Sequence, residues 1–506
     1  MPDLDALIAE LQALYLADQL PWVLAVSGGK DSTATAQLVW AALAALPPAQ
    51  RHKPVHVIST DTGVEQPLVA AWATSMLDHM QAAADAQGLP LETHRLQAPA
   101  TESFWVHVIG KGYGAPSRAF RFCTDRLKVR PANRFMQGLN QAAWGSITIL
   151  GTRRAESTGR AQTMAKYESA STRKGLSQNG SMANGWVCTP VADWSHDDVW
   201  EFLLTHDNPW GVPNRDLFDL YRGANPDREC PVILDMSAGP TDTATCGGSR
   251  FGCWTCTIVR HDRSLQATID NNPTNAWMQP LADFRNELAA SIHDHDLRDF
   301  RRSDGQVRLG PDGRPNPGPY IKSTRERWLE KLLTLQRDLR TTAPPAFQDW
   351  TLIRDDEVRE IRRPWVQDKH EWDDTAPVIW ERVFGTPYPY LDDLATPEFS
   401  RDDWQLLEDV TDGNRLMTEC LSTLLDLEVQ ARRAGVRAKP EDFRAVLRRT
   451  SYTDAEDAAA VVRAQQAQQE QVLQGERDTP VLTAAPAAPR PASRQLALWE
   501  LESATN

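Results

Sequence analysis

The sequence predicts an α/β fold with a doubly wound, mostly parallel sheet, joined to a cysteine-rich segment and an α-helical C-terminal region. Two observations carry this prediction. Over residues 1–207, short apolar runs alternate with longer stretches of helical periodicity, the pattern of a parallel sheet with helices on both faces. Beyond residue 262, the strand-like runs stop and helical patterns, several with tryptophans, follow one another.

Each element has its own signal. Apolar residues at helical spacing predict a first helix over residues 4–20, where Pro21 ends the pattern. A second helix, residues 32–46, follows a glycine turn. Continuous apolar runs predict strands over residues 22–26, 55–59, 91–96 and 146–150. C-terminal helices are expected over residues 267–297, 323–339 and 402–434, with a hairpin or ordered loop over 305–320.

These signals divide the chain into four parts. Residues 1–207 form the sheet domain, and 208–262 form a segment rich in Pro, Gly and Cys with little periodicity. Residues 263–450 form a helical domain. Residues 451–506 begin with a helix and end in a Pro/Ala-rich tail with too little apolar surface to fold.

Composition excludes several classes of protein. With 506 residues, 41% hydrophobic and 24% charged, the chain can bury a sizeable core. No apolar run approaches the roughly 18 residues of a membrane helix, and the start carries acids where a signal peptide would carry lysines, so we expect a cytoplasmic protein without a membrane partner. The net charge of −14 argues against a generic nucleic-acid coat. Residues 107–174 nevertheless carry thirteen Lys or Arg against three acids, so any nucleic-acid contact is expected there.

The hexapeptide SGGKDS follows the first predicted strand and opens the next helix. Its residues are Ser27, Gly28, Gly29, Lys30, Asp31 and Ser32. A glycine pair at this place lets main-chain N–H groups and a helix N-terminus face a phosphate. The G-x-x-x-x-G-K-[ST] spacing of a kinase-type loop is missing, so that class of site is excluded.

Three further elements supply groups that a nucleotide needs. Asp61, Thr62 and Gly63 end the second strand, where a carboxylate can hold Mg²⁺ or a ribose hydroxyl. The other two elements offer cations for phosphate or sulfate and include Cys123, Lys128, Gly151, Arg153, Arg154, Glu156, Ser157 and Arg160.

Four cysteines, Cys230, Cys246, Cys253 and Cys256, lie within 27 residues on a glycine-rich stretch. Their spacing suits an iron–sulfur cluster better than tetrahedral zinc, and unligated thiols are the third alternative. Cys123 lies among arginines, an electropositive setting that favours its thiolate; it is either a reactive carrier of persulfide sulfur or a buried structural thiol. Cys188 and Cys420 are expected to be packed core thiols, and His196 a surface residue at a helix start.

SGGKDS resembles the PP-loop of the ATP pyrophosphatase superfamily, whose fold is that of the adenine nucleotide alpha hydrolases. Together with DTG, C-x₃-LK-x₂-P, GTRRAES-x₂-R and VADWSHDDVW in this order, it resembles the PAPS reductase branch. The resemblance implies ATP as substrate, cleaved to AMP and pyrophosphate. Cys123 has no adjacent cysteine and the tail has none, unlike reductases of sulfonucleotides.

With the segment CP…CGGSRFGCWTC and the helical extension containing YIKSTRERWL, the chain resembles the DndC family, the sulfurtransferases of bacterial DNA phosphorothioation. The resemblance implies a [4Fe-4S] cluster on the four clustered cysteines. It also implies DNA as the acceptor, a cysteine desulfurase as sulfur donor, and other subunits of the modification system as partners. The catalytic candidates are Lys30, Asp31, Cys123, Arg153 and Arg154.

Two alternatives remain. One is a PAPS or adenylylsulfate reductase, or a tRNA thiolase, on the same fold. The other is a metal-stapled protein that binds ATP without turning it over.

Overall fold

The computed structural model describes residues 3–169, 173, 175–180, 184–225, 252–394 and 398–478, with residues 393 and 472–478 described by their backbone alone. Its first half is built on one six-stranded sheet in the order β3-β2-β1-β4-β6-β5. Neighbouring strands are parallel except for the β5–β6 pair. The strands are β1 Trp22–Ala25, β2 Val55–Asp61, β3 Leu91–Gln97, β4 Ser146–Leu150, β5 Ser177–Gln178 and β6 Gly185–Cys188. The predicted doubly wound, mostly parallel sheet is confirmed.

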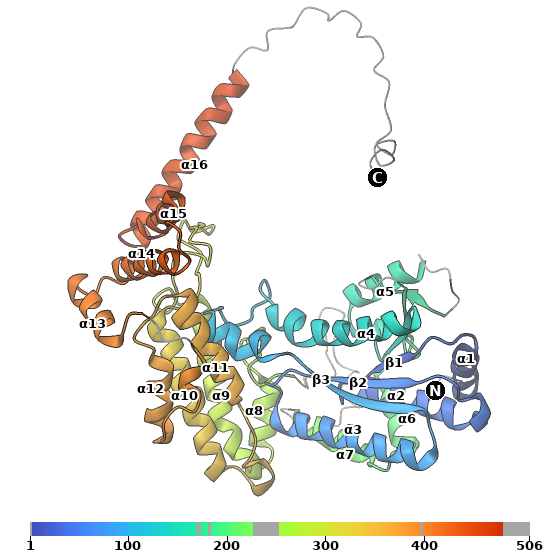
Figure 1. The fold of residues 1–506 in the computed structure, drawn as a ribbon. Helices are drawn as coiled ribbons and strands as arrows, with labels where there is room; N and C mark the ends of the chain where they lie inside the picture. The colour runs from blue at the N-terminus through green and yellow to red at the C-terminus, as the bar shows by residue number, and fades with distance from the viewer. Residues whose placement is uncertain are drawn as a thin grey trace, which may run out of the picture.

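Helices cover both faces of the sheet (Figure 1). Helices α4 and α5 lie on one side, and α2, α3, α6 and α7 lie on the other. Their bounds are α1 Leu4–Leu16, α2 Lys30–Ala44, α3 Pro67–Gln87, α4 Arg130–Ala143, α5 Thr158–Ser169, α6 His196–Thr205 and α7 Asn214–Gly223. The predicted first and second helices are both present, with their ends shifted by a few residues.

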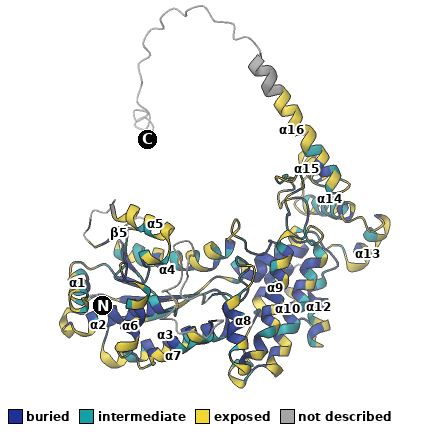
Figure 2. Ribbon diagram, turned by 180° about the vertical axis from the view of Figure 1, so that it is seen from behind, coloured by how far each residue is buried: buried dark blue, intermediate teal, exposed yellow. Residues whose placement is uncertain are grey.

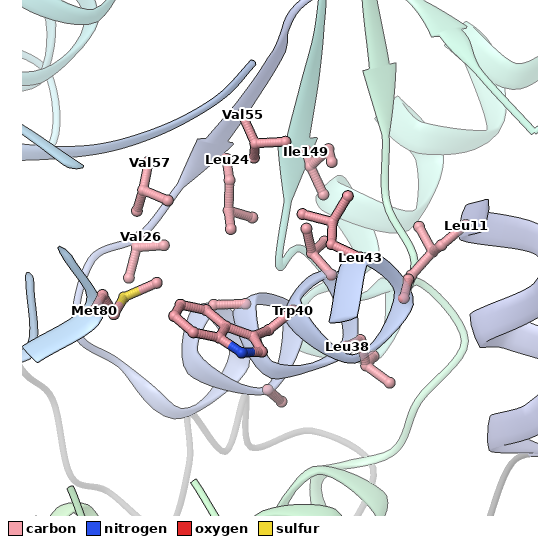
Figure 3. Close-up of a cluster of buried hydrophobic side chains, with 14 of the residues drawn as sticks. Leu11, Leu24, Val26, Leu38, Trp40, Leu43, Val55, Val57, Met80 and Ile149 are labelled. Atoms are coloured by element: carbon pink, nitrogen blue, oxygen red, sulfur yellow. The ribbon is translucent and has the colours of Figure 1, made fainter. Parts of the chain in front are cut away.

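The main core lies between the sheet and α2. Figure 3 shows the indole of Trp40 beneath apolar side chains of the central strands, among them Leu24 and Val57, and beneath Val26, which follows β1. All four of these side chains are buried, and each contributes about 1.5–3 kcal/mol by leaving water. This packing holds the carboxyl ends of β1, β2 and β4 side by side, which is where a parallel sheet binds its ligands.

The C-terminal half is helical, as predicted. Its helices are α8 Arg263–Asp270, α9 Gln279–Ala290, α10 Lys322–Thr342, α11 Asp355–Arg363, α12 Thr375–Phe384, α13 Arg401–Val410, α14 Arg415–Arg433, α15 Pro440–Thr450 and α16 Ala455–Asp478. Figure 2 shows buried residues concentrated in α8, α9 and α10, whereas α16 is mostly exposed. Within the described residues, no helix has both the length and the apolar composition to cross a membrane.

Two of the predicted helices are interrupted. The helix expected over 267–297 ends at Asp270, because Asn272 caps a new turn that begins at Pro273. The helix expected over 402–434 is two helices, because Asp412 and Gly413 adopt positive φ angles of 50° and 67°. The hairpin or ordered loop expected over 305–320 contains an isolated antiparallel bridge between Leu309 and Pro315.

Candidate nucleotide and cysteine sites

The loop between β1 and α2 is shaped by its two glycines. Gly28 has a φ of +76°, a conformation that side chains with a Cβ rarely adopt, and a Cβ there would lie 3.2 Å from that of Ala73. The indole N–H of Trp72 donates to the Gly28 carbonyl at 3.0 Å, which ties the loop to α3. Gly29 then caps α2, so the N-terminus of a 15-residue helix opens onto the loop. This local geometry is the one expected of an anion cradle, and anion binding by the loop, called the cradle below, stays a prediction.

Two serine hydroxyls brace the loop from within. The Ser32 hydroxyl accepts from the Ser27 N–H at 3.2 Å and donates to the Gly29 carbonyl at 2.9 Å. The two hydroxyl oxygens are 3.3 Å apart. The main-chain N–H of Lys30 donates to the Tyr221 hydroxyl at 3.3 Å, so α7 supports the cradle as well.

One carboxylate holds two cations beside the cradle. Lys30 Nζ lies 2.7 Å from Asp31 Oδ2, and Arg153 Nε lies 2.6 Å from Asp31 Oδ1. The Lys30 and Arg153 side chains are 0% and 3% exposed. Two buried cations against one carboxylate leave an excess positive charge next to a helix N-terminus, an arrangement that favours a polyphosphate.

Gly151 lets the end of β4 approach α2 closely. A Cβ at this position would lie 2.7 Å from the carbonyl oxygen of Asp31 and 2.8 Å from the amide nitrogen of Ser32. Only a residue without a side chain fits there. The close packing therefore explains why a glycine occupies position 151. The same close approach brings the Arg153 side chain to Asp31.

The other charged residues of the GTRRAES element form ion pairs away from Asp31. Arg154 pairs with Glu168 at 2.7 Å and with Asp193. Glu156 accepts from the Arg153 N–H at 2.8 Å and pairs with Arg160, whose N–H donates to the Ser157 hydroxyl at 3.2 Å. Of the predicted cations, Arg153 joins the cradle, and Arg154 and Arg160 lie in separate ion pairs. Their assignment to the nucleotide stays a prediction.

Asp61 ends β2 with both carboxylate oxygens engaged. One oxygen accepts from the Gly63 N–H at 2.8 Å, where a φ of +72° turns the chain. The other lies 2.9 Å from a guanidinium nitrogen of Arg95 and 3.1 Å from the amide nitrogen of Gln97. Thr62 lies between Asp61 and Gly63 in the chain, and its hydroxyl group contacts Cys253 of the cysteine segment.

Three cysteines line one cavity of about 130 Å³, namely Cys123, Cys253 and Cys256, together with Thr62 and Lys128. The Cys253 sulfur lies 3.3 Å from the Thr62 hydroxyl oxygen. Main-chain bonds from Trp254 N–H to the Val64 carbonyl (3.0 Å) and from Gln66 N–H to the Gly252 carbonyl (3.2 Å) fix the segment along the loop after β2. Cys230 and Cys246 lie outside the described residues.

Burial governs the charge state of these thiols. It raises the pKa of the Cys253 thiol to about 11, against a smaller opposite effect of the Lys128 charge. It also raises the pKa of Cys123, and the neighbouring Cys256 adds to that rise. The expectation that arginines would favour a Cys123 thiolate is therefore wrong, because desolvation outweighs the hydrogen bonds that lower this pKa.

Five of the thirteen cations of residues 107–174 pair with carboxylates from outside that stretch. The pairs are Arg130–Glu102, Arg134–Glu102, Arg153–Asp31, Arg154–Asp193 and Arg173–Asp18. The positive excess counted along the sequence is thus partly neutralised in the fold. In the described part of the chain, the exposed side chains of Arg118, Arg121 and Lys128 belong to no ion pair.

Several residues at these sites were not singled out by the sequence. Tyr221 and Trp72 support the cradle from distant helices, and Arg95 holds Asp61. Burial raises the pKa of Glu65, which pairs in a β-bridge with Cys253, to about 7. No local pattern could have identified them, since each acts through a contact across the fold.

The remaining thiols and His196 lie apart from the cavity. Cys188 is buried on β6, and burial raises its pKa to about 12, as expected of a core thiol. Cys420 on α14 is only half-buried. His196 begins α6 as predicted, but it is half-buried, and burial together with the nearby Lys30 charge lowers its pKa.

Comparisons with known proteins find similarity over the first half of the chain. Residues 21–258 match the phosphoadenosine phosphosulfate reductase domain family. A phosphoadenosine 5'-phosphosulfate reductase of Xanthomonas oryzae is 26% identical over 220 residues, which cover 42% of this chain and 76% of that protein. An uncharacterised protein of Methanocaldococcus jannaschii is 28% identical over 212 residues, covering 42% of this chain and 37% of that protein.

Two solved structures are similar over part of the chain. The PAPS reductase of Candida auris aligns with a TM-score of 0.27 and 15% identity, covering 43% of this chain and 91% of that one. The U34-tRNA thiolase NcsA of Methanococcus maripaludis, which holds a [4Fe-4S] cluster, aligns with a TM-score of 0.26 and 11% identity, covering 57% and 79%.

Proposed function

Since residues 21–258 are a PAPS-reductase-like domain of the PP-loop superfamily, we propose that this protein uses ATP to replace a non-bridging oxygen of the DNA backbone with sulfur. One observation carries the proposal. The loop after β2 lies beside the cradle strand β1 and also contacts Cys253 through Thr62, so an anion cradle and a three-thiol cavity share one edge of the sheet. Activating a phosphate with ATP requires a site for the nucleotide's phosphates, and supplying sulfur requires reactive thiols.

The first step would be adenylation. A non-bridging oxygen of the DNA phosphate attacks the α-phosphorus of ATP, a new P–O bond forms, and the bond to pyrophosphate breaks with its electrons leaving on pyrophosphate. The α2 N-terminus, Lys30 and Arg153 would stabilise the charge that develops on the leaving group, since a helix N-terminus and two cations meet at the loop. Asp31 orients both cations through its two carboxylate oxygens.

The second step would be sulfur transfer. The persulfide of a cysteine desulfurase reacts with a second thiol, which yields a disulfide and hydrosulfide. Hydrosulfide attacks the adenylated phosphorus, a P–S bond forms, and AMP leaves with the original oxygen, while the proton on sulfur passes to solvent. The cavity lined by Cys123 offers thiols for the exchange.

Two of the predicted cluster ligands, Cys253 and Cys256, line the cavity, and such thiols suit an iron–sulfur cluster. A cluster held there by the cysteines of the CP…CGGSRFGCWTC segment would supply iron with affinity for sulfur. Mg²⁺ stays a prediction. The Asp31 carboxylate pairs with Lys30 and Arg153, and the Asp61 carboxylate pairs with Arg95, so an ion held by either would share its ligand oxygens with these cations.

DNA is proposed as the acceptor on the resemblance to the DndC family and on charge. Exposed Arg118 and Arg121 lie within the segment from Pro116 to Lys128, and both ends of this segment line the cysteine cavity. Removing a side chain that binds one phosphate should reduce the slope of log affinity against log salt by about 0.9 for duplex DNA. We expect Arg118→Ala with Arg121→Ala to lower this slope relative to the control Arg437→Ala, which changes an exposed residue of the helical region.

The test of the function is a reconstitution with ATP, DNA and a cysteine desulfurase under anaerobic conditions. The expected products are AMP, pyrophosphate and, after nuclease digestion of the DNA, dinucleotides with a phosphorothioate linkage by mass spectrometry. ADP as the nucleotide product would contradict the proposal. So would stoichiometric ATP binding without turnover, which would support the non-enzymatic alternative.

The similarity to PAPS reductases over residues 21–258 favours a second candidate, reduction of a sulfonucleotide. Sulfite released from PAPS in the presence of a thiol reductant would support it. Thiolated nucleosides in tRNA, with unmodified DNA, would instead indicate a tRNA thiolase.

A further inference from the structure

A group of two histidines and a glutamate lies on β2 and β3, away from both sites described above. His56 pairs in register with Glu92, and Ile58 pairs with His94. Because side chains two residues apart share a face, His56, Glu92 and His94 all project from the side of the sheet that packs against α4. His56 and Glu92 are the second residues of their strands, so the group lies toward the amino ends of β2 and β3, opposite the edge that carries the cradle.

The three ligand atoms form a compact triangle. His56 Nδ1 lies 3.0 Å from His94 Nε2, and Glu92 Oε2 lies 3.6 Å from the former and 3.7 Å from the latter. The circle through three points with these separations has a radius of about 2.0 Å, close to the Zn–N and Zn–O bond lengths of about 2.0–2.2 Å. A single ion can therefore sit within bonding distance of all three atoms, slightly out of their plane, with one tetrahedral position open.

The imidazoles are held in place by an aromatic side chain. Phe135 of α4 lies with its ring centroid 4.7 Å from that of His94 and 5.7 Å from that of His56. The two imidazole centroids are 5.1 Å apart. The ligands stand on paired strands of a regular sheet, and such rigid placement is what a metal site needs in order to bind without rearrangement. Glu92 is 64% exposed, so an ion can enter from solvent.

We propose that His56, Glu92 and His94 form a binding site for a divalent transition metal of the Zn²⁺ type, separate from the cysteine cavity. Two imidazoles and one carboxylate are ligands that suit Zn²⁺, Co²⁺ and Ni²⁺. Mg²⁺ and Ca²⁺ prefer oxygen ligands and should bind this set weakly. In the absence of metal, one imidazole nitrogen donates to the other. Metal binding moves that proton to the second nitrogen of its ring, so both facing nitrogens become ligands.

The experiment is Zn²⁺ binding by equilibrium dialysis of the full-length protein, compared with His94→Ala and Glu92→Gln. Zinc on the cysteines is common to all variants, so the difference between proteins reports this site alone. We expect wild type to bind one more equivalent than His94→Ala, and Glu92→Gln to bind that equivalent more weakly. His79→Ala, which removes an exposed histidine of α3, should match wild type.

Co²⁺ gives a second readout. Cobalt bound here should show visible absorption bands without the thiolate charge-transfer band of a cysteine site, and His94→Ala should lose this component. Equal zinc stoichiometry in wild type and His94→Ala would overturn the proposal, as would saturation only at millimolar Zn²⁺. Thermal unfolding in EDTA should be alike for wild type and Glu92→Gln, which shows that any loss of zinc is not a loss of fold.

Discussion

The cradle after β1 and the cysteine cavity lie at the same edge of the sheet, yet they treat charge in opposite ways. In the cradle, Lys30 and Arg153 are buried as ions because Asp31 pairs with both. In the cavity, burial holds Cys253 in its neutral thiol form. The cradle therefore already presents an excess of positive charge, whereas the thiols must release protons to bind a metal, so metal loading should become more favourable as pH rises.

The largest effect should come from removing one of the buried cations of the cradle. Lys30→Met removes a buried cation of the cradle while keeping an apolar chain of similar length. We expect AMP formation to fall by about 10²- to 10³-fold, the usual effect of losing one group that stabilises developing charge. The measurement is AMP release under saturating ATP. Lys439→Met, at an exposed position before α15, should retain the wild-type rate; an unchanged rate in Lys30→Met would remove the cradle from the mechanism.

The next effect separates the two sites. Cys123→Ser changes a wall of the cysteine cavity and leaves the cradle untouched, so we expect phosphorothioate and AMP formation to fall to background while pyrophosphate is still released in the first, adenylation step. The measurement is the ratio of phosphorothioate to pyrophosphate in the first turnover of the reconstituted reaction. Cys420→Ser, on α14, is the matched control. If Cys123→Ser keeps the full ratio, Cys123 is only a structural thiol.

The same comparison shows how far the sequence could lead. The cradle was predictable because the loop is local: a buried strand, two glycines and a helix start follow one another in the chain. The pairing of Asp31 with Arg153 needed β1 and β4 to be neighbours, which alternating strands and helices imply without giving the strand order. Gly151 was assigned to the nucleotide, but its steric contact with Asp31 appears only when the strands are placed.

The cysteine cavity was less predictable. The sequence grouped Cys253 and Cys256 by their spacing, and the structure adds Cys123 from a segment 130 residues earlier. The charge expected on Cys123 was wrong, because a count of nearby arginines contains no information about burial. Tyr221, 191 residues from Lys30, is a further case in which only packing reveals the contact.

A smaller effect tests the close approach that joins the two strands at the cradle. Gly151→Ala places a Cβ 2.7 Å from the Asp31 carbonyl, and we expect a destabilisation of about 1–3 kcal/mol together with weaker ATP binding. Gly159→Ala is the matched control, because a Cβ on this α5 glycine meets nothing within 4 Å and should stabilise the helix by about 0.5–1 kcal/mol. Thermal unfolding measures both. Equal stabilities of the two variants would show that β4 can shift away from α2.

The smallest effect is a pH dependence of the free energy of unfolding that comes from His107, whose ring stacks on Phe122 next to Cys123. His107 is fully buried, its Nδ1 lies 2.8 Å from the Ser103 carbonyl oxygen, and its ring stacks on Phe122 at 5.3 Å. Burial lowers its pKa to about 4. Between pH 6.5 and 4, the unfolded chain binds a proton that the folded protein does not, so the free energy of unfolding is retained above pH 6.5 and is lost as pH falls.

At pH 5 this loss amounts to about 2 kcal/mol, since each pH unit below the unfolded value corresponds to about 1.4 kcal/mol. His107→Gln is uncharged at every pH and should remove that part of the difference between pH 7.5 and pH 5 in urea unfolding, even if it lowers stability at both. A pH difference as large in His107→Gln as in wild type would show that His107 accepts its proton within the fold. The cavity wall would then admit water, and the neutral state that burial gives the neighbouring thiols would need another explanation.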